Sequence, residues 1–159
     1  MSVEENKSVK KMWEDYLMSI NETVEMTEKK YEAWSFCHDE KNANELAKLV
    51  KEKKKTSTSS LHYLYILEDE ALPAEDEYSV IFDGSGEAQC VIQTTKINVV
   101  PFNEVTEAFA KKEGEGDLTL EYWRNVHRDY FTEELKDYEK EFTEEMMVVC
   151  EDFKIVYPK

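Results

Sequence analysis

The chain has 159 residues, a length typical of one domain that buries a core without disulfides or a structural metal. Acidic residues outnumber basic ones by 36 to 20, which leaves a net charge of −16 at pH 7. A surface this acidic argues against extended DNA or long RNA held through phosphates, and against anionic membranes. An anionic ligand would therefore need a local basic site.

The cysteines Cys37, Cys90 and Cys150 lie far apart and form no CxxC pair. We therefore expect reduced thiols in a cytoplasmic protein, with no disulfide framework. The triplet Cys37, His38 and Asp39 has no partner cluster, so we expect no metal and no cofactor. No apolar run approaches the ~20 residues that span a bilayer, and the first residues lack the apolar core of a signal peptide.

In the first half of the chain, apolar residues from Val9 to Ile20 recur at helical spacing and predict an amphipathic helix. Residues 22–30 are polar and predict a connection. A second helix is expected to follow a cap at Asp39 or Asn42 and to run into a lysine cluster that ends at Lys55. Residues 56–60 fit either a strand or a loop, and for residues 61–67 we favour a short helix.

The second half is predicted to be rich in strands. Residues 78–82 and 88–100 favour β structure and are separated by an Asp-Gly turn at residues 83–84. Asn103 is expected to cap a short helix that Gly114 and Gly116 end. Another amphipathic helix begins near Thr119, and residues 146–157 predict a closing strand. This order indicates an α+β protein whose strands are mostly antiparallel.

Six segments, taken in order, resemble the ASCH domain family, and specifically its stand-alone acidic bacterial proteins. They are WSF at residues 34–36, KKTSTSSL at 54–61, the DG turn before CVIQTT, VVPFNEV, EGEGDLTLEYWRNVH at 113–127, and VVCEDFKIVY near the end. The resemblance covers roughly residues 31 to 157. It implies a PUA-like, mixed and mostly antiparallel β-barrel with flanking helices, formed by residues 31–159, with residues 1–30 as an N-terminal helix packed on it.

The same resemblance implies a cleft for RNA or nucleotides, lined by the lysine motif that follows the second helix. Some small bacterial relatives resemble amidohydrolases that remove the acetyl group of N(4)-acetylcytidine with a lysine, a threonine and a glutamate. Carried over residue by residue, these become Lys55, Thr58 and Glu115, with Glu113 and Asp117 as alternatives for the acid. The neighbouring Lys54 and Thr56 belong to the same motif and are expected to line the cleft.

Amide hydrolysis needs a nucleophile, a base that activates it and an acid for the leaving amine. A neutral Lys55 could take the proton of Thr58, which requires that burial and neighbouring lysines lower the pKa of Lys55. Glu115 could then donate a proton to the cytosine amine or hold a water. Alternatively, the lysines are a solvated helix end, Thr56 and Thr58 are ordinary strand residues, and the acidic block is a surface turn.

Aromatic residues supply further candidate ligand contacts. Trp34 and Phe36 could stack on a base or pack in the core. Trp123 and His127 lie one helical turn apart and so share a face, where His127 is either a site residue or a hydrogen-bonded packing residue.

The chain departs from the wider family motif at two places. Lys53 stands where the family has a glycine before the lysine pair, and Ser59 and Ser60 stand where it has an arginine. The missing arginine favours a nucleoside-sized ligand over an RNA backbone. We therefore expect a protein that binds a nucleoside, a nucleotide or a short RNA element. The alternatives are an amidohydrolase acting on N(4)-acetylcytidine-like nucleosides and a protein-interaction module without catalysis.

Overall fold

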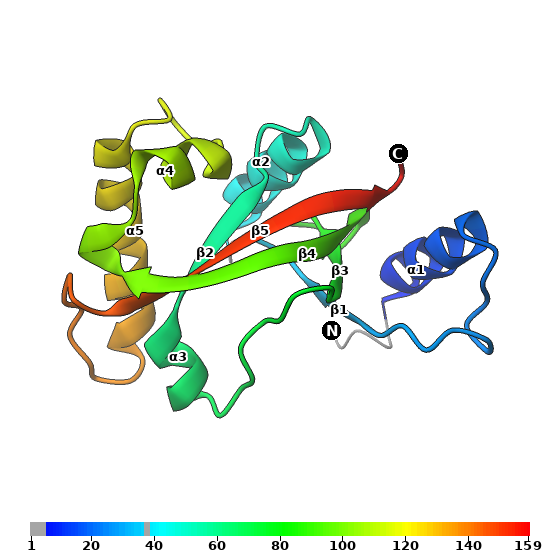
Figure 1. The fold of residues 1–159 in the computed structure, drawn as a ribbon, viewed down its shortest axis with the longest axis horizontal. Coiled ribbons are helices and arrows are strands. Elements are labelled where there is room, and N and C mark those ends of the chain that lie inside the picture. Colours follow the sequence, from blue (N-terminus) through cyan, green and yellow to red (C-terminus); the bar gives the residue numbers. More distant parts are fainter. Residues whose placement is uncertain (1–5, 37–38) are drawn as a thin grey trace. The chain divides into compact units, whose positions relative to one another are not determined.

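The computed structural model describes residues 6–36 and 39–159, so Cys37 and His38 of the rejected metal triplet lie outside the described residues. The chain forms two compact units. The first comprises residues 1–54, 75–95 and 153–159, and the second comprises residues 55–74 and 96–152. Two long strands, β4 (Ala88–Pro101) and β5 (Met147–Tyr157), each contribute residues to both units (Figure 1).

The first unit begins with the predicted amphipathic helix, α1 (Lys7–Ser19), whose N-terminus is capped by the Asn6 side chain. Its buried stripe includes Val9, Trp13 and Leu17 and packs on the strands β1 (Tyr31–Trp34) and β3 (Tyr78–Phe82). The second predicted helix, α2 (Glu40–Lys51), is capped by Asp39, one of the two residues expected for that role.

The predicted hairpin between β3 and β4 is confirmed. One carboxylate oxygen of Asp83 accepts hydrogen bonds from the backbone of Ser85 and Glu87, which closes the turn. Gly84 is needed here because a Cβ atom at this position would lie 2.6 Å from the Cα atom of Glu40. The turn therefore depends on close approach to α2 as well as on its own residues.

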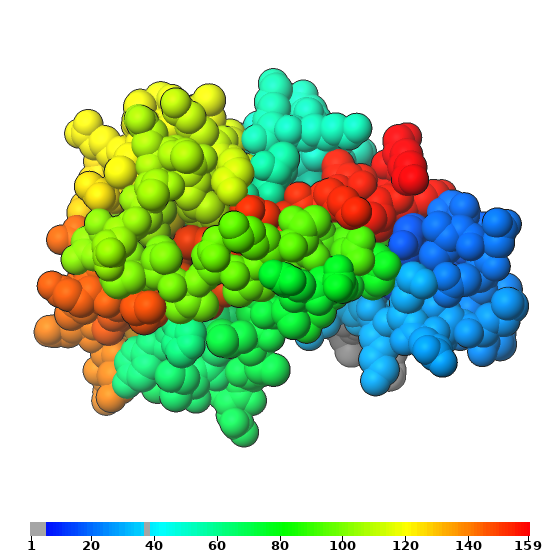
Figure 2. Space-filling view, in the orientation of Figure 1, coloured from blue at the N-terminus to red at the C-terminus, as the bar shows by residue number. Residues whose placement is uncertain are grey.

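The second unit contains β2 (Ser57–Leu61), which pairs with β5 in antiparallel register, and the short helix α3 (His62–Leu67). It also contains α4 (Glu107–Glu113) and α5 (Leu120–Lys136). The buried core of this unit is rich in aromatic side chains and includes Phe102, Phe109, Trp123 and Phe131. Figure 2 shows that the segment linking α4 to α5, residues 114–119 (yellow-green to yellow), lies at the surface on the face drawn.

One predicted cap is wrong. Residues Phe102–Glu104 form a separate 3-10 turn, and α4 is capped by Thr106, whose side chain accepts from the backbone of Phe109. The reason is tertiary: the backbone N–H groups of Phe102 and Asn103 donate to the carbonyls of Met146 and Glu144. These contacts hold the turn against the chain that precedes β5, so the helix starts later.

The five strands are hydrogen-bonded in the order β1-β3-β4-β5-β2. β1 and β3 are parallel, whereas β3–β4 and β2–β5 are antiparallel, so the α+β class with a mixed sheet is confirmed. Among the described residues the sheet has β1 and β2 as its edges and does not close, so the expected barrel is not confirmed. No helix in the described part of the chain is long and apolar enough to cross a membrane.

Candidate functional site

Lys55 lies just before β2 and is the residue around which the site is built. Its side chain is only 1% exposed. The Nζ atom donates to the backbone carbonyl of Ser57 and to the carboxylates of Glu113 and Glu115, each at 2.9 Å. The three protons of the ammonium group therefore match three acceptors, which is what a buried lysine requires. The burial of Lys55 excludes the alternative in which its side chain belongs to a solvated helix end.

Glu113 ends α4 and is the most enclosed acid of the site, with a side chain 2% exposed. One carboxylate oxygen pairs with Lys55, and the other accepts from the Ser59 hydroxyl and the Trp123 indole N–H. Burial alone would raise the pKa of Glu113, but Lys55, then His127 and these hydrogen bonds outweigh it and lower the pKa well below its ordinary value. Glu113 is thus a fixed negative charge.

Glu115 is the second carboxylate on Lys55, and its side chain is 20% exposed. It lies between Gly114, which ends α4 in the left-handed conformation, and Gly116, which also has a positive φ. Two glycines at positive φ allow a tight path that presents Glu115 from a surface loop. Glu115 therefore forms the solvent-facing edge of an otherwise buried cluster.

The charge of Lys55 follows from these two partners. Burial alone would lower the pKa of Lys55, but the carboxylates of Glu113 and Glu115 more than offset this, and the net pKa is raised above its ordinary value. Lys55 is therefore an ammonium group at neutral pH in the ligand-free protein. The mechanism in which a neutral Lys55 acts as the base is not favoured by this arrangement.

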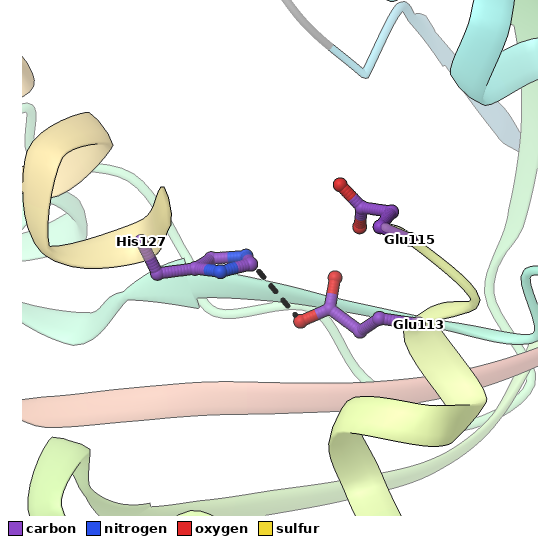
Figure 3. Close-up of side chains that lie close together, drawn as sticks. All are labelled: Glu113, Glu115 and His127. Carbon is purple, nitrogen blue, oxygen red and sulfur yellow. Dashed lines mark ion pairs between the residues drawn. The ribbon is translucent and has the colours of Figure 1, made fainter. Parts of the chain in front are cut away.

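His127 and Trp123 share one face of α5, as their spacing predicts, and their rings stack with centroids 4.3 Å apart. The Nδ1 atom of His127 lies 2.8 Å from the Trp123 carbonyl oxygen, which only accepts, so Nδ1 carries the proton. The Nε2 atom faces Glu113 at 3.5 Å, the contact drawn in Figure 3. His127 therefore contacts the cluster through Glu113.

The hydroxyl groups on β2 divide between the two faces of the strand. Ser57 donates to Asp152 and Ser59 donates to Glu113, so these two side chains lie on the face of the cluster. Because side chains alternate along a strand, Thr58 points to the opposite face. Ser59 was not predicted as a site residue, although alternation from Lys55 would have indicated it. Thr58 as the nucleophile stays a prediction that this geometry does not favour.

The remaining predicted residues have other surroundings. Trp34 and Phe36 belong to the first unit and pack on its core near Phe153. Lys54 is exposed. The Thr56 hydroxyl lies 3.3 Å from the Lys112 carbonyl oxygen, and Asp117 accepts from the backbone and hydroxyl of Thr119 at the start of α5. We assign Asp117 a structural role, because its acceptor capacity organises this helix start.

Glu113, Glu115 and His127 bring oxygen and nitrogen atoms within 4.8 Å of one another, a grouping seen in metal sites (Figure 3). Here, however, the Lys55 ammonium lies 2.9 Å from both carboxylates and takes the place of a cation. A metal ion would have to displace a buried charge, so these residues do not suit one.

The two arginines of α5 have partners outside this cluster. Arg128 pairs with Glu144 at 2.8 Å, and Arg124 donates to the Asn103 carbonyl. Two surface hollows in the first unit, of about 290 and 400 Å³, are lined by none of the predicted site residues. The Lys55 cluster in the second unit is thus the candidate site.

Comparison with known proteins agrees with this fold. The family model described as the ASCH domain matches residues 32–157, so the chain belongs to the ASCH domain family. This family is PUA-like and is associated with RNA binding. No curated protein is similar enough to this chain to count as a match.

Two solved structures resemble the chain along most of its length. The ASCH domain from Lactobacillus crispatus JV V101 is 37% identical with a TM-score of 0.86, over 93% of both chains. Protein EF3133 from Enterococcus faecalis V583 is 34% identical with a TM-score of 0.84, over 94% of this chain and 88% of that one. The family match starts at residue 32, next to the predicted boundary between residues 30 and 31, but the division into those two parts stays a prediction.

Proposed function

We propose that this protein binds a nucleoside, or a nucleotide-sized element of RNA, at the cluster of Lys55, Glu113 and Glu115. The observation that carries the proposal is the ion pair between the buried Lys55 and the partly exposed Glu115. A buried charge held by a partner at the surface is typical of a ligand site, and membership of an RNA-associated family supports the same class of ligand.

The chemistry of the pair suits the polar edge of a nucleobase. Glu115 can accept from an exocyclic amino group, and the Lys55 ammonium can donate to a carbonyl oxygen or ring nitrogen. Cytosine presents such an amino donor beside acceptors, and so fits this arrangement. The three protons of the Lys55 ammonium group already have three acceptors. We therefore expect an acceptor atom of the ligand to take the hydrogen bond that Lys55 now donates to Glu115, while Glu113 keeps the ammonium group charged.

The binding test is calorimetric titration of the protein with cytidine. Glu115→Gln removes the charge and keeps the size of the side chain, and it is expected to weaken binding about tenfold or more, as for a charged hydrogen bond. The matched control is Glu121→Gln, an exposed acid in the first turn of α5. If both variants weaken cytidine binding equally, or if neither weakens it, the ligand does not bind at Glu115.

A second candidate is hydrolysis of an N(4)-acyl group, and the observation that favours it is that the predicted pair Lys55 and Glu115 are in contact at 2.9 Å. With Lys55 charged, the roles change. The Glu115 carboxylate would take a proton from water as that water attacks the acyl carbon, and Lys55 would stabilise the oxyanion. Glu115 would then return the proton to the departing amine, giving cytidine and the carboxylic acid.

The hydrolysis test is release of cytidine from N(4)-acetylcytidine. If this mechanism operates, Glu115→Gln abolishes release, whereas Thr58→Val leaves most of it because the Thr58 side chain faces away from the cluster. Loss of activity in Thr58→Val with an intact fold would instead support the threonine nucleophile. If the wild type neither binds nor hydrolyses nucleosides and binds no nucleotide or short RNA, the remaining alternative is a protein-interaction module.

A further inference from the structure

The exposed aromatic residue next to the candidate site has no role in the cluster described above. Tyr122 lies in the first turn of α5 and is 38% exposed. Within the described residues, its hydroxyl makes no hydrogen bond to the protein and its ring makes no contact with another aromatic ring. A large aromatic side chain left in this state at a surface is a common feature of binding sites.

The position of the Tyr122 ring relates it to Glu115. A Cβ atom placed on Gly116 would lie 2.3 Å from two ring atoms of Tyr122, so the ring lies directly against the backbone of Gly116. Gly116 is the residue that follows Glu115, and consecutive Cα atoms are about 3.8 Å apart. The loop that presents the Glu115 carboxylate is therefore the same loop on which the Tyr122 ring rests.

Two exposed aliphatic residues flank Tyr122 in the sequence. Leu118 precedes it by four residues and Val126 follows it by four, and these side chains are 42% and 37% exposed. Residues four apart lie on one face of a helix, so Tyr122 and Val126 share a face at the start of α5. Leu118 lies in the turn just before the helix, where its backbone N–H donates to the Glu115 carbonyl. A polar pair bordered by an exposed aromatic and aliphatic strip matches a base, which has a polar edge and an apolar face.

We propose that Tyr122 is the surface on which the base of the bound nucleoside stacks, so that the site recognises an unpaired, planar nucleobase. This inference rests on the proposed nucleoside site and adds its selectivity. Bases in a duplex have both faces covered by neighbours, so the site takes a free nucleoside, a nucleotide or an unstacked base of single-stranded RNA. Gly116 belongs to this arrangement because any side chain there would displace the ring.

The test compares the affinity of cytidine for the wild type, Tyr122→Phe, Tyr122→Leu and Ile66→Ala by calorimetric titration, where Ile66 is an exposed aliphatic residue on α3 with no place in the site. Stacking predicts that Tyr122→Leu weakens binding about tenfold or more, that Tyr122→Phe stays within about threefold of the wild type, and that Ile66→Ala changes little. Wild-type binding of cytidine that is unchanged in Tyr122→Leu overturns the stacking role and leaves the proposed function standing. Failure of the wild type to bind any of cytidine, uridine or adenosine overturns both.

A second variant tests the loop contact without removing the aromatic ring. Gly116→Ala adds a methyl group where the ring lies, and is expected to weaken cytidine binding as Tyr122→Leu does. In the double variant Gly116→Ala/Tyr122→Leu the two losses should not add, because both remove the same contact. Additive losses would contradict the stacking role. Thermal unfolding of each variant shows whether the fold is retained.

Discussion

Two glutamates in the same site differ in how much each supports the fold. Glu113 is enclosed and accepts hydrogen bonds from Lys55, Ser59 and Trp123. Glu115 lies at the solvent edge, and within the described residues its carboxylate accepts a hydrogen bond only from Lys55. Removing one partner of a buried pair costs far more than removing a partner that water can replace. Glu113 is thus expected to serve the structure and Glu115 the ligand.

This difference predicts unequal effects on stability. Glu113→Gln should lower the free energy of unfolding by about 3 kcal/mol, and Glu115→Gln by about 1 kcal/mol, at neutral pH. The measurement is urea unfolding followed by tryptophan fluorescence. Folding lowers the pKa of Glu113, so its carboxylate adds to the free energy of unfolding above the ordinary glutamate pKa. This stabilisation is lost as the pH falls through the lowered pKa of Glu113. The difference in the free energy of unfolding between the wild type and Glu113→Gln should therefore become smaller at acid pH. A difference that becomes larger at acid pH would contradict this prediction.

At the scale of elements, hydrogen bonds at the end of α4 and the start of α5 explain how the site is assembled. Gly114 ends α4 with its backbone N–H donating to the Lys111 carbonyl, and Thr119 starts α5 while its hydroxyl donates to Asp117. The loop between the two helices is therefore held at both ends. This short, restrained connection is what keeps Glu115 beside Lys55.

A second element contact makes a pH-dependent prediction. Glu134 on α5 is partly buried close to Glu68, the residue that follows α3, and Glu68 accepts from the Tyr138 hydroxyl. Burial and then repulsion from Glu68 raise the pKa of Glu134 to about 7. Because the pKa of Glu134 is raised in the folded protein, the free energy of unfolding is highest below the ordinary pKa of a glutamate. It falls as the pH rises through about 7 and Glu134 becomes charged.

Glu134→Gln imitates the protonated side chain and should match the wild type near pH 5. Near pH 8.5 it should be more stable than the wild type by about 1 kcal/mol, a value reduced because Glu134 is partly exposed to solvent. Thermal or urea unfolding at the two pH values measures this, and Glu141→Gln, an exposed acid, is the control. A Glu134→Gln effect of the same size at both pH values would rule out the proposed titration.

At the scale of the whole molecule, the net charge of −16 limits the ligand. A long RNA held through phosphates releases counterions and weakens steeply with salt, whereas a neutral nucleoside releases none. We expect the affinity for cytidine to change less than about twofold between about 0.05 and 0.5 M sodium chloride. A single-stranded RNA of about 20 nucleotides is expected to bind no more tightly than its terminal nucleotides alone. Tight RNA binding with a steep salt slope would contradict a nucleoside-sized site.

Periodicity and composition determined most of the secondary structure, because helix and strand patterns are local. The stripe of α1, the β3–β4 hairpin and the start of α5 at Thr119 all follow from neighbouring residues. The cap of α4 did not, because backbone contacts to residues before β5 move the helix start from Asn103 to Thr106. The sequence also did not predict that the sheet has two open edges, because closure of a sheet into a barrel depends on pairing between strands that are far apart in the sequence.

The same division holds for the site. The resemblance to the ASCH family was sufficient to single out Lys55 and Glu115, and the structure places them 2.9 Å apart. Only the tertiary structure decided that Glu113 is the buried partner, that Ser59 faces the cluster while Thr58 points to the opposite face, and that Lys55 is charged. The physical reason is that a lysine pKa depends on the balance between burial and nearby carboxylates, and residues 55 and 113 become neighbours only when the chain folds.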